Sequence, residues 1–551
     1  MSRPLWALSA AALCGGCSGS EGAAVPPPSS AWFEEQTESR GVRYEHRAFE
    51  VQRFDFPEIM GGGVALLDGD GDGDLDVLFP GGGDPRALPG ARSAPRYFVN
   101  DGSGTFQDLT AVSGFTPGAY SMGAACGDHD QDGDVDVFLT GVGDTRLFLN
   151  EGGRFRDVTD AAGARAEGWT TSAGFLDFDA DGRLDLFAAR YVDWAPEREL
   201  DCRAGDDVRD YCAPTRYARP STALLLWNAG AGRFEDASAR LGLAAESAHG
   251  LGVASLKREE GAALLVANDL LPNQAWIGAD GGLVNRAMDW GLAVNSAGFA
   301  ASGMGIHCAD FDDDGDLDVF VAHLRRQGHS LFVQTPKGTF RDEAARCGLL
   351  RPTLPFTGFG AGFADFDNDG DLDLFVANGR VAREHPLPDP TNPYAEESQL
   401  FEQREEGRFR EVLPRGGLTS PCIASSRGAA FGDLDNDGGV DVVVVDWNGR
   451  ARLLHNRAHT AGGWLGLWVR ETHGGDAIGA RVELVVDGRS RFRDVNPVYS
   501  YLASNDPRVH FGLGPRGVAQ RLRVRWADGS VEEFPVPAAG AYHELRRVRS
   551  R

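Results

Sequence analysis

The sequence has 551 residues, with 81 acidic against 54 basic side chains and a formal charge of −27. A chain of this length is too long for one hydrophobic core, so we expect two or more domains. The strong negative charge disfavours nucleic acid as a partner and favours cations. Glycine is abundant at 73 residues while 42% of the chain is hydrophobic, which is typical of many strands joined by tight turns.

The N-terminus has the pattern of an export signal. Residues 1–17, MSRPLWALSAAALCGGC, contain one Arg, a short apolar run and small residues that end at Cys17. Leu-Cys-Gly-Gly-Cys resembles a bacterial lipobox, which implies lipidation of Cys17, although Cys14 stands where an aliphatic residue is usual. We expect an outer-membrane or cell-surface lipoprotein, or a secreted protein, with residues 18–31 as a flexible tether. No later segment has the ~20 apolar residues of a transmembrane helix, so membrane contact is expected only through the lipid.

Six cysteines follow the signal, an even number that favours disulfides in an exported chain. Cys202 and Cys212 lie close together in a loop-like insert, DCRAGDDVRDYC, and we expect them to be paired. Cys126 and Cys308 lie in apolar runs where a buried free thiol fits equally well. The state of Cys347 and Cys422 stays open.

A nine-residue acidic motif occurs six times. It is first seen as DGDGDGDLD from Asp68, and later copies begin at Asp128, Asp177, Asp310, Asp365 and Asp433. Every copy has Asp at positions 1, 3, 5 and 9 and Gly at position 6. A single Asp-Gly pair indicates only a β-turn. In this repeated motif the side chains at positions 1, 3 and 5 of a curled loop are expected to converge, and the Asp at position 9 completes a cage of oxygen atoms. Two carboxylates ~4 Å apart repel by about 4 kcal/mol at an effective dielectric constant of roughly 20, so the motif predicts a bound cation.

The predicted ligands are all oxygen atoms. Position 7 contributes its backbone carbonyl, so its side chain is free to vary. The expected ligand residues are Asp68, Asp70, Asp72, Asp74 and Asp76; Asp128, Asp130, Asp132, Asp134 and Asp136; Asp177, Asp179, Asp181, Arg183 and Asp185; Asp310, Asp312, Asp314, Asp316 and Asp318; Asp365, Asp367, Asp369, Asp371 and Asp373; and Asp433, Asp435, Asp437, Gly439 and Asp441. An irregular cage of oxygen ligands favours Ca²⁺ over Mg²⁺, and we expect up to six calcium ions.

An EF-hand is the alternative interpretation of this loop. It needs a bidentate Glu at position 12 and flanking helices. Position 12 is instead Phe79, Leu139, Ala188, Val321, Val376 or Val444 in the six copies. The flanks are β-branched or aromatic runs of strand length. Each loop is therefore expected to join two strands.

Each loop is followed by a second module of two short strands, such as RLFLNEGGRFRDVTDAAG from Arg146, so one repeat has about the size of a propeller blade. Seven second modules occur, and residues 254–269 keep the strand pattern without the Asp cluster, which predicts a blade that has lost its calcium. Residues 32–41 match the ending that the last module lacks and are expected to complete the last blade. We predict an all-β fold, with a seven-bladed β-propeller over residues 32–462 and a small β domain over residues 463–551.

The repeats resemble FG-GAP (VCBS-type) propellers such as the integrin α-subunit head. The motifs IGARVELVVDG from Ile478, HFGLG from His510 and LRVRWADGSVEEF from Leu522 resemble the ASPIC/UnbV domain of the cartilage acidic protein family and of bacterial exported relatives. The resemblance implies calcium in the blade loops and an architecture. It implies no reaction.

The C-terminal region holds 14 Arg against 10 Asp and Glu from Gly463 to Arg551, so it is mildly basic beside an acidic ring. Docking on the propeller by charge complementarity is one hypothesis. A solvated surface is the other.

No G-x-S-x-G, H-E-x-x-H or Walker motif is present, and His46, His249, His307, His323 and His329 are expected to have satisfied structural roles. Aromatic residues near strand ends fit either blade core or a ligand-binding face; they are Tyr191, Trp194, Trp227, Trp276 and Trp447.

We expect a non-catalytic, calcium-binding scaffold that holds a protein or polysaccharide. The alternatives are an extracellular enzyme or enzyme accessory acting on polysaccharide, with a groove built from inserts 193–221 and 380–398, and a structural surface protein without a specific ligand.

Overall fold

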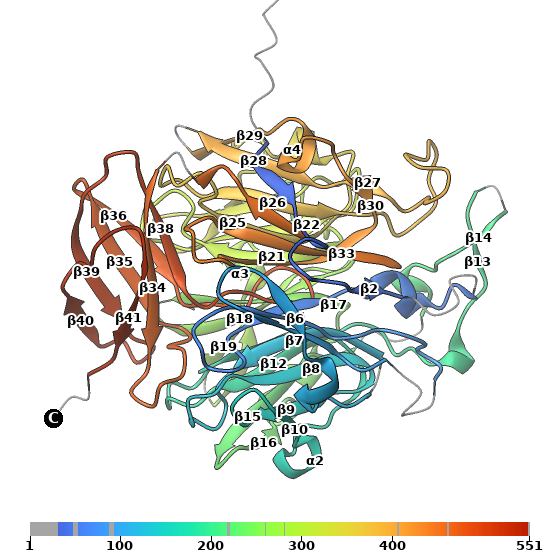
Figure 1. Ribbon diagram of the computed structural model, residues 1–551. Coiled ribbons are helices and arrows are strands. Elements are labelled where there is room, and N and C mark those ends of the chain that lie inside the picture. Colours follow the sequence, from blue (N-terminus) through green and yellow to red (C-terminus); the bar gives the residue numbers. More distant parts are fainter. Residues whose placement is uncertain are drawn as a thin grey trace, which may run out of the picture.

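The computed structural model describes residues 31–47, 53–87, 93–118, 120–205, 207–217, 221–258, 260–279, 281–404, 407–459 and 462–548 (Figure 1). Strands dominate these residues and the α-helices are single turns, so the all-β prediction is confirmed. None of the helices in this part of the chain has the length and apolar character that a bilayer crossing requires. The predicted signal, Cys17 and nearly all of the tether lie outside the described residues.

Most strands form four-stranded antiparallel groups in which consecutive strands pair edge to edge. Three groups come from the first part of the ring: β3 (Val64–Leu67), β4 (Asp76–Phe79), β5 (Arg96–Asn100) and β6 (Phe106–Asp108); β7 (Tyr120–Gly127), β8 (Asp136–Asp144), β9 (Arg146–Asn150) and β10 (Phe155–Asp157); and β11 (Glu167–Leu176), β12 (Asp185–Arg190), β15 (Leu224–Gly230) and β16 (Arg233–Asp236). Three more follow: β17 (Gly250–Arg258), β18 (Gly261–Asn268), β19 (Gln274–Ala279) and β20 (Gly282–Asn285); β21 (Gly303–Ala309), β22 (Asp318–His323), β23 (Ser330–Gln334) and β24 (Phe340–Asp342); and β25 (Gly358–Ala364), β26 (Asp373–Asn378), β28 (Gln399–Arg404) and β29 (Arg408–Glu411).

The last group is completed by the N-terminal segment, as expected from its sequence. It consists of β31 (Ser426–Gly432), β32 (Asp441–Asp446), β33 (Gly449–Asn456) and β1 (Phe33–Glu35), and β2 (Glu45–His46) also pairs with β33. Strand β1 runs antiparallel to β33, with Phe33 opposite Asn456. The first strands of successive groups contact one another in a closed cycle, from β3 through β7, β11, β17, β21 and β25 to β31 and back to β3. The groups therefore close into a ring, and the pairing of β1 with β33 fastens the first segment of the chain to the last group.

Glycines on the first strands let neighbouring groups approach closely. A Cβ atom on Gly252 would lie 2.1 Å from the carbonyl oxygen of Met304, and one on Gly305 would lie 2.0 Å from that of Phe359. Farther out, large apolar side chains fill the space between groups; one such cluster includes Phe320, Phe363 and Phe401. Close-packed backbones near the axis and bulky residues toward the rim produce the wedge shape that closes a ring.

Two inserts and several helical turns decorate this ring. The first insert connects β12 to β15 and carries β13 (Cys202–Arg203) and β14 (Arg209–Asp210), and the second connects β26 to β28 and carries β27 (Glu396–Glu397), which pairs with β30 (Ile423–Ala424). The helical turns α1 (Thr110–Ser113), α2 (Thr159–Ala162), α3 (Ala287–Trp290) and α4 (Leu350–Thr353) follow β6, β10, β20 and β24. Each insert follows the second strand of its group, so both inserts lie at the end of the ring opposite the acidic loops.

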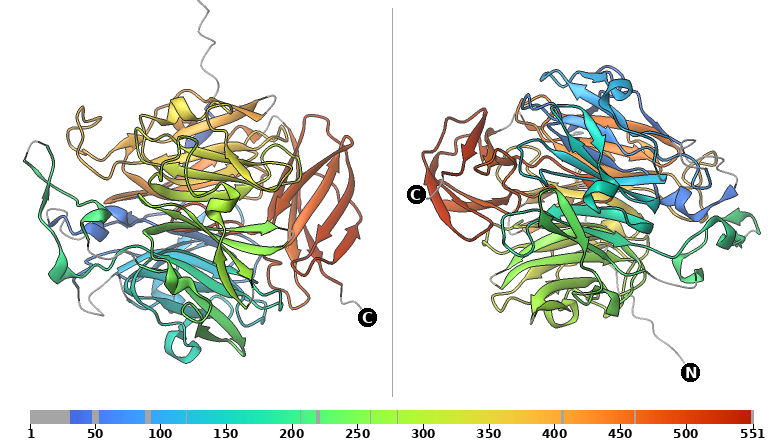
Figure 2. Two further views of the ribbon diagram at one scale, coloured as in Figure 1. Left: turned by 180° about the vertical axis from the view of Figure 1, so that it is seen from behind. Right: turned by 90° about the horizontal axis from the view of Figure 1, so that it is seen from below.

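The C-terminal domain is a separate pair of sheets with its own core. One sheet contains β34 (Gly463–Arg470), β38 (Val509–Gly514) and β41 (Tyr542–Arg546), and the other contains β35 (Arg481–Val486), β36 (Arg489–Asp494), β39 (Ala519–Arg525) and β40 (Val531–Phe534). Figure 2 shows this domain on one side of the ring and the insert hairpin β13–β14 on the opposite side.

One segment of the C-terminal domain enters the centre of the ring. Between β36 and β38 the chain crosses to the propeller, where β37 (Ala503–Ser504) runs parallel to β3. Ser500 exchanges backbone hydrogen bonds with Ile306 at 2.8 and 3.2 Å, and the Leu502 carbonyl accepts from Val64 N–H at 3.2 Å. Ser500 and Leu502 have φ values of 80° and 53°, which side-chain-bearing residues seldom adopt. We call residues 497–506 the axial segment, because they pair with first strands from several groups.

Candidate metal-binding loops

The six acidic loops connect the first and second strands of their groups. For example, the loop from Asp128 joins β7 to β8, which pair with Gly127 opposite Asp136. Strands flank every copy, so the hairpin prediction is confirmed and the EF-hand alternative is wrong. The fourth group has no such loop, because β17 and β18 form a hairpin whose pairing reaches Arg258 and Gly261.

The backbone of each loop is folded by its own carboxylates. The N–H of the position-6 glycine donates to the position-1 carboxylate in all six copies, at 2.8–3.3 Å. The N–H at position 7 donates to the position-5 carboxylate, as between Asp134 and Asp132 at 3.0 Å. Position 6 has a positive φ, for example 101° at Gly133, which explains why glycine is required there. Position 4 is also left-handed even where it is Gln131 or Ala180, a feature that sequence reasoning missed.

This folding brings like charges together, with position 1 more buried than positions 3 and 5. In the loops from Asp68, Asp128 and Asp177, carboxylate oxygens at positions 1, 3 and 5 lie within 4.8 Å of one another. Burial, opposed by backbone hydrogen bonds, raises the pKa of Asp68 and of Asp177 to about 6. Burial likewise raises the pKa of Asp310 to about 7. The ionised loops are therefore electrostatically unfavourable without a counter-charge.

The donor set fits a hard divalent cation. Several buried carboxylate oxygens have no hydrogen-bond partner among the described residues, including Oδ2 of Asp318 and Oδ1 of Asp365 and Asp433. These three residues are at most 2% exposed. Leaving such an oxygen unsatisfied costs free energy, which a metal–oxygen bond would recover. Carboxylate and carbonyl oxygens are the ligands that calcium takes.

The position-9 aspartates also hold the blade together. In Asp136, Oδ1 accepts Asn150 N–H at 2.9 Å and Oδ2 accepts His129 N–H at 3.0 Å. Equivalent pairs of bonds occur at Asp76, Asp373 and Asp441. Because a carboxylate oxygen can accept two bonds, this residue can join the loop to the next hairpin and still have capacity for a cation.

Comparisons with known proteins identify two regions of the chain. Residues 68–139, 128–188 and 310–376 match the family model of the FG-GAP-like repeat, and residues 471–550 match that of ASPIC and UnbV. The chain carries FG-GAP-like repeats and an ASPIC/UnbV domain. Cartilage acidic protein 1 of Xenopus tropicalis is 29% identical over 239 residues, which are 42% of this chain and 34% of that protein. Cartilage acidic protein 1 of Homo sapiens is 27% identical over 249 residues, 42% of this chain and 33% of that protein. The matched part thus spans about a third of the length of these relatives.

Two solved structures share the general arrangement only weakly. A lectin of Agrocybe aegerita, described as recognising non-reducing terminal N-acetylglucosamine, is 15% identical, with a TM-score of 0.38, over 81% of this chain and 98% of its own. A BBS1N chain in complex with ARL6DN is 9% identical, with a TM-score of 0.38, over 78% and 98%. Both likenesses are too weak to guide an assignment.

The ASPIC/UnbV domain lies over the FG-GAP loops and presents cations to them. His473 Nδ1 lies 3.0 Å from Asp128 Oδ2, and Arg481 Nη1 donates to the carbonyl oxygen of Gly315 at 2.7 Å. Arg470 approaches Asp68 at 3.7 Å. These contacts support docking by charge complementarity in place of a solvated surface, with the axial segment as an additional attachment that the sequence did not predict.

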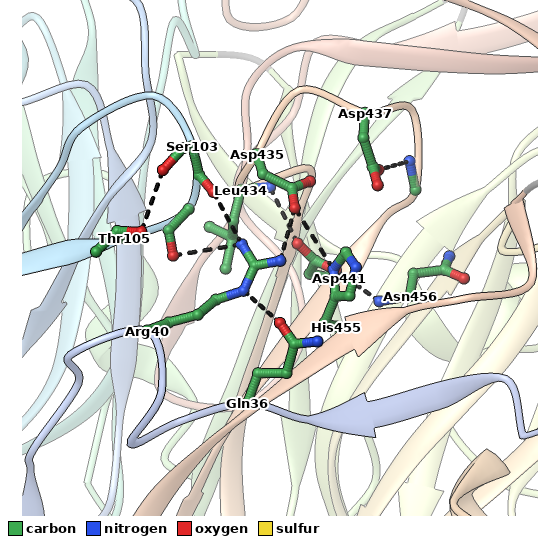
Figure 3. A network of polar contacts seen from close by, with 12 residues as sticks. Gln36, Arg40, Ser103, Thr105, Leu434, Asp435, Asp437, Asp441, His455 and Asn456 are labelled. Atoms are coloured by element: carbon green, nitrogen blue, oxygen red, sulfur yellow. Dashed lines mark hydrogen bonds and ion pairs between the residues drawn. The ribbon is translucent and has the colours of Figure 1, made fainter.

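Cations from the ring itself, and not only from the ASPIC/UnbV domain, contact the loop from Asp433 (Figure 3). Arg40, from the N-terminal segment, donates to Asp435 Oδ2 at 2.7 Å and to Gln36 Oε1 at 2.7 Å. His455 Nδ1 lies 3.2 Å from Asp441 Oδ1 and 3.6 Å from Asp435 Oδ2. In the loop from Asp177, Arg183 is paired with Asp181 in a similar way. These two loops are also the two copies without Asp at position 7, where they have Gly439 and Arg183.

We call the end of the ring that carries the two inserts, opposite the acidic loops, the insert face. It holds the predicted disulfide and three of the five aromatic residues named from the sequence. Cys202 and Cys212 are bonded, whereas Cys126, Cys308, Cys347 and Cys422 are free thiols. Tyr191, Trp194 and Trp447 form one buried cluster at this face, while Trp276 and Trp227 pack between blades. All five aromatic residues pack in apolar clusters, which agrees with the core role, and the ligand-binding role stays a prediction.

The histidines are buried, but their predicted structural roles differ in detail. His329 Nδ1 accepts the N–H of His323 at 3.1 Å, while its Nε2 has no hydrogen-bond partner among the described residues. His249 Nδ1 pairs with the carbonyl oxygen of Asp269 at 3.0 Å. Both ring nitrogens of His46 lack a hydrogen-bond partner in the described residues, so the expectation of a satisfied role is wrong there.

Proposed function

We propose that the protein is an exported binding scaffold whose ring is stabilised by calcium and whose insert face holds a protein or polysaccharide ligand. The observation that carries the calcium part is the convergence of position-1, -3 and -5 carboxylates in hairpin loops, together with buried position-1 and position-9 oxygens that no group among the described residues satisfies. The side chains at positions 1, 3, 5 and 9 and the carbonyl at position 7 would hold each ion. Bound calcium supplies positive charge that offsets the carboxylate repulsion.

The two ends of the ring differ in what covers them, and this difference supports the insert face as the binding surface. The ASPIC/UnbV domain covers the loop face, through contacts such as Arg508 Nη2 with the Asp433 carbonyl at 2.7 Å. The opposite face carries the long inserts, which are the elements that vary most freely on a rigid ring. Export and anchoring through Cys17 belong to the same proposal and rest on the sequence alone.

A calcium titration of the full chain tests the stabilisation directly. Isothermal calorimetry should show several bound calcium ions, and differential scanning calorimetry should show a lower Tm in excess EDTA than in excess calcium, because binding to the folded state alone stabilises it. An unchanged Tm in EDTA would refute structural calcium. The ligand is then sought with glycan arrays and with pull-downs from a native envelope fraction, and failure of both would favour a structural surface protein without a specific ligand.

A further inference from the structure

A cavity of about 250 Å³ lies at the insert face, over the centre of the ring. Its walls include the aromatic rings of Phe56, Tyr191, Tyr211 and Phe359, contributed by different parts of the ring and by the first insert. It exceeds the ~150 Å³ cavity that accommodates benzene and is smaller than the ~300–1,000 Å³ of pockets for drug-sized ligands. The volume suits one six-membered ring with small substituents.

The axial segment packs behind part of the cavity wall. Tyr501 donates its hydroxyl to the carbonyl oxygen of Met60 at 2.9 Å, and its ring centroid lies 4.9 Å from that of Phe359. Met60 and Phe359 both line the cavity. Tyr501, which comes from the ASPIC/UnbV side and is fully buried, thus packs against two residues of the cavity wall.

The walls are held in place before any ligand arrives. Asp210 joins the two inserts, because its carboxylate accepts the Tyr394 hydroxyl at 2.7 Å and the Arg383 N–H at 2.8 Å. The Cys202–Cys212 disulfide closes the first insert, and Tyr211 donates to Glu58 Oε2 at 3.1 Å. A pre-organised site loses little conformational entropy on binding, which favours affinity for a small ligand.

Two polar groups on the wall have unused hydrogen-bonding capacity. Asp269 is 7% exposed; its Oδ2 accepts the Tyr191 hydroxyl at 2.6 Å, whereas its Oδ1 has no hydrogen-bond partner among the described residues. The Ser302 hydroxyl lies near enough to this carboxyl to lower its pKa, but burial has the larger effect and raises it. Arg325 Nε is buried without a hydrogen-bond partner, although Nη1 lies 3.2 Å from Glu384.

The charges around the cavity disfavour an ionic ligand. Arg325 and Arg326 share Glu384, and Arg380 pairs with Glu396 at 3.0 Å. A carboxylate ligand would meet the buried Asp269, and a cation would meet the arginines. A hydroxyl group both donates and accepts, so it can satisfy an acceptor such as Asp269 Oδ1 and a donor such as Arg325 Nε. Aromatic walls complement the C–H faces of a sugar ring.

We propose that this cavity binds one neutral hexose-sized sugar ring, as the terminal unit of a glycan, with Asp269 and Arg325 bonding its hydroxyl groups and the apolar part of the wall packing against its faces. The inference rests on the proposed binding function and specifies its ligand class. It concerns the insert face only and does not depend on calcium chemistry.

The test uses the full chain in excess calcium. Ligand-observed NMR and calorimetry are run with glucose, galactose, mannose, N-acetylglucosamine, N-acetylgalactosamine and fucose, and with benzoate and benzylamine as charged ring probes. Ala382→Trp fills the cavity that Ala382 lines, and Ala111→Trp places the same bulk at an exposed alanine on α1 as a matched control. Asp269→Asn retains shape while changing the acceptor.

We expect at least one neutral sugar to bind, Ala382→Trp to weaken it more than tenfold, and Ala111→Trp to leave it unchanged. Asp269→Asn should weaken binding about tenfold or more, the size of a lost hydrogen bond to a charged group. The proposal is overturned if no sugar binds, if only a charged ring binds, or if Ala382→Trp binds the sugar normally. If a glycan or protein still binds the Ala382→Trp variant, this site is overturned but the scaffold function is retained. If EDTA does not change the Tm, the calcium-stabilised scaffold is refuted and the sugar site is not affected.

Discussion

The side-chain amide of Asn150 donates to the carbonyl oxygen of Gly69 in the preceding blade at 2.8 Å. The same amide donates to the Val135 carbonyl of its own loop at 3.1 Å. Asn456 makes the corresponding pair of bonds to Phe366 and Val440 at 2.8 and 3.2 Å. One buried asparagine therefore joins two adjacent acidic loops, so the geometry of each loop depends on its neighbour.

Replacing this link should destabilise the ring. Asn150→Ala removes both amide bonds and leaves buried carbonyl oxygens unsatisfied, which should lower the free energy of unfolding by about 2–4 kcal/mol. Urea unfolding monitored by fluorescence measures the change, and Gln107→Ala, at an exposed strand position, is the control. A difference below about 0.5 kcal/mol between the two variants would show that the inter-blade bonds contribute little.

Removing one carboxylate should remove one calcium ion. Asp132 is the position-5 residue of its loop, and Asp132→Asn removes its negative charge while keeping an oxygen that can accept the Asp134 N–H, a bond of 3.0 Å in the wild type. We expect calorimetry to count one fewer tightly bound ion than in the wild type. Glu260→Gln, in the hairpin that has no acidic loop, should bind the wild-type number. An undiminished count in Asp132→Asn would contradict the assignment of that loop.

The sequence was sufficient to predict the features that repeat. Five fixed positions in six loops predicted the hairpins, and the match of residues 32–41 to a missing module ending predicted the pairing of β1 with β33. The asparagine links were visible as an Asn or Gln before six of the seven second-module turns. Their partners lie in another blade, and a strand-period pattern does not reveal contacts between blades.

The features that occur once were not predictable. Residues 497–506 have no repeat, and two of them hold positive φ values without glycine, so nothing local indicates that they enter the ring. The cavity beside Asp269 depends on two inserts, a buried tyrosine from another domain and the ring itself. Such a site is defined by tertiary packing alone, which a single sequence does not specify.

The axial segment should fasten the ASPIC/UnbV domain to the propeller. Tyr501→Ala leaves a space at a fully buried position and removes the bond to Met60, which should cost about 3–5 kcal/mol. We expect a lower Tm and faster proteolysis near residues 457–463, measured by calorimetry and by mass spectrometry of limited digests. Tyr501→Phe, which removes only the hydroxyl, should cost about 1 kcal/mol. Equal proteolysis of Tyr501→Ala and wild type would mean that the domain is held by its surface contacts.

Two contacting histidines on one blade should make stability fall as the solution is acidified. Burial lowers the pKa of His323 to about 4 and that of His329 to about 3, against about 6.5 in an unfolded chain. Their stabilising contribution is thus complete above pH ~6.5 and is lost as pH falls toward the folded values, because the unfolded chain binds more protons in that range.

His329→Asn removes one titrating group and keeps an acceptor for the His323 N–H. In saturating calcium, the loss of unfolding free energy between pH 7 and pH 5 should be about 2 kcal/mol smaller in this variant than in the wild type, from about 1.4 kcal/mol per pH unit below 6.5. His543→Asn, at a partly exposed site in the ASPIC/UnbV domain, should retain the wild-type slope. Urea titrations at the two pH values measure the difference. If the unfolding free energy of His329→Asn and of the wild type changes equally with pH, the His329 imidazole has the same charge in the folded and the unfolded chain.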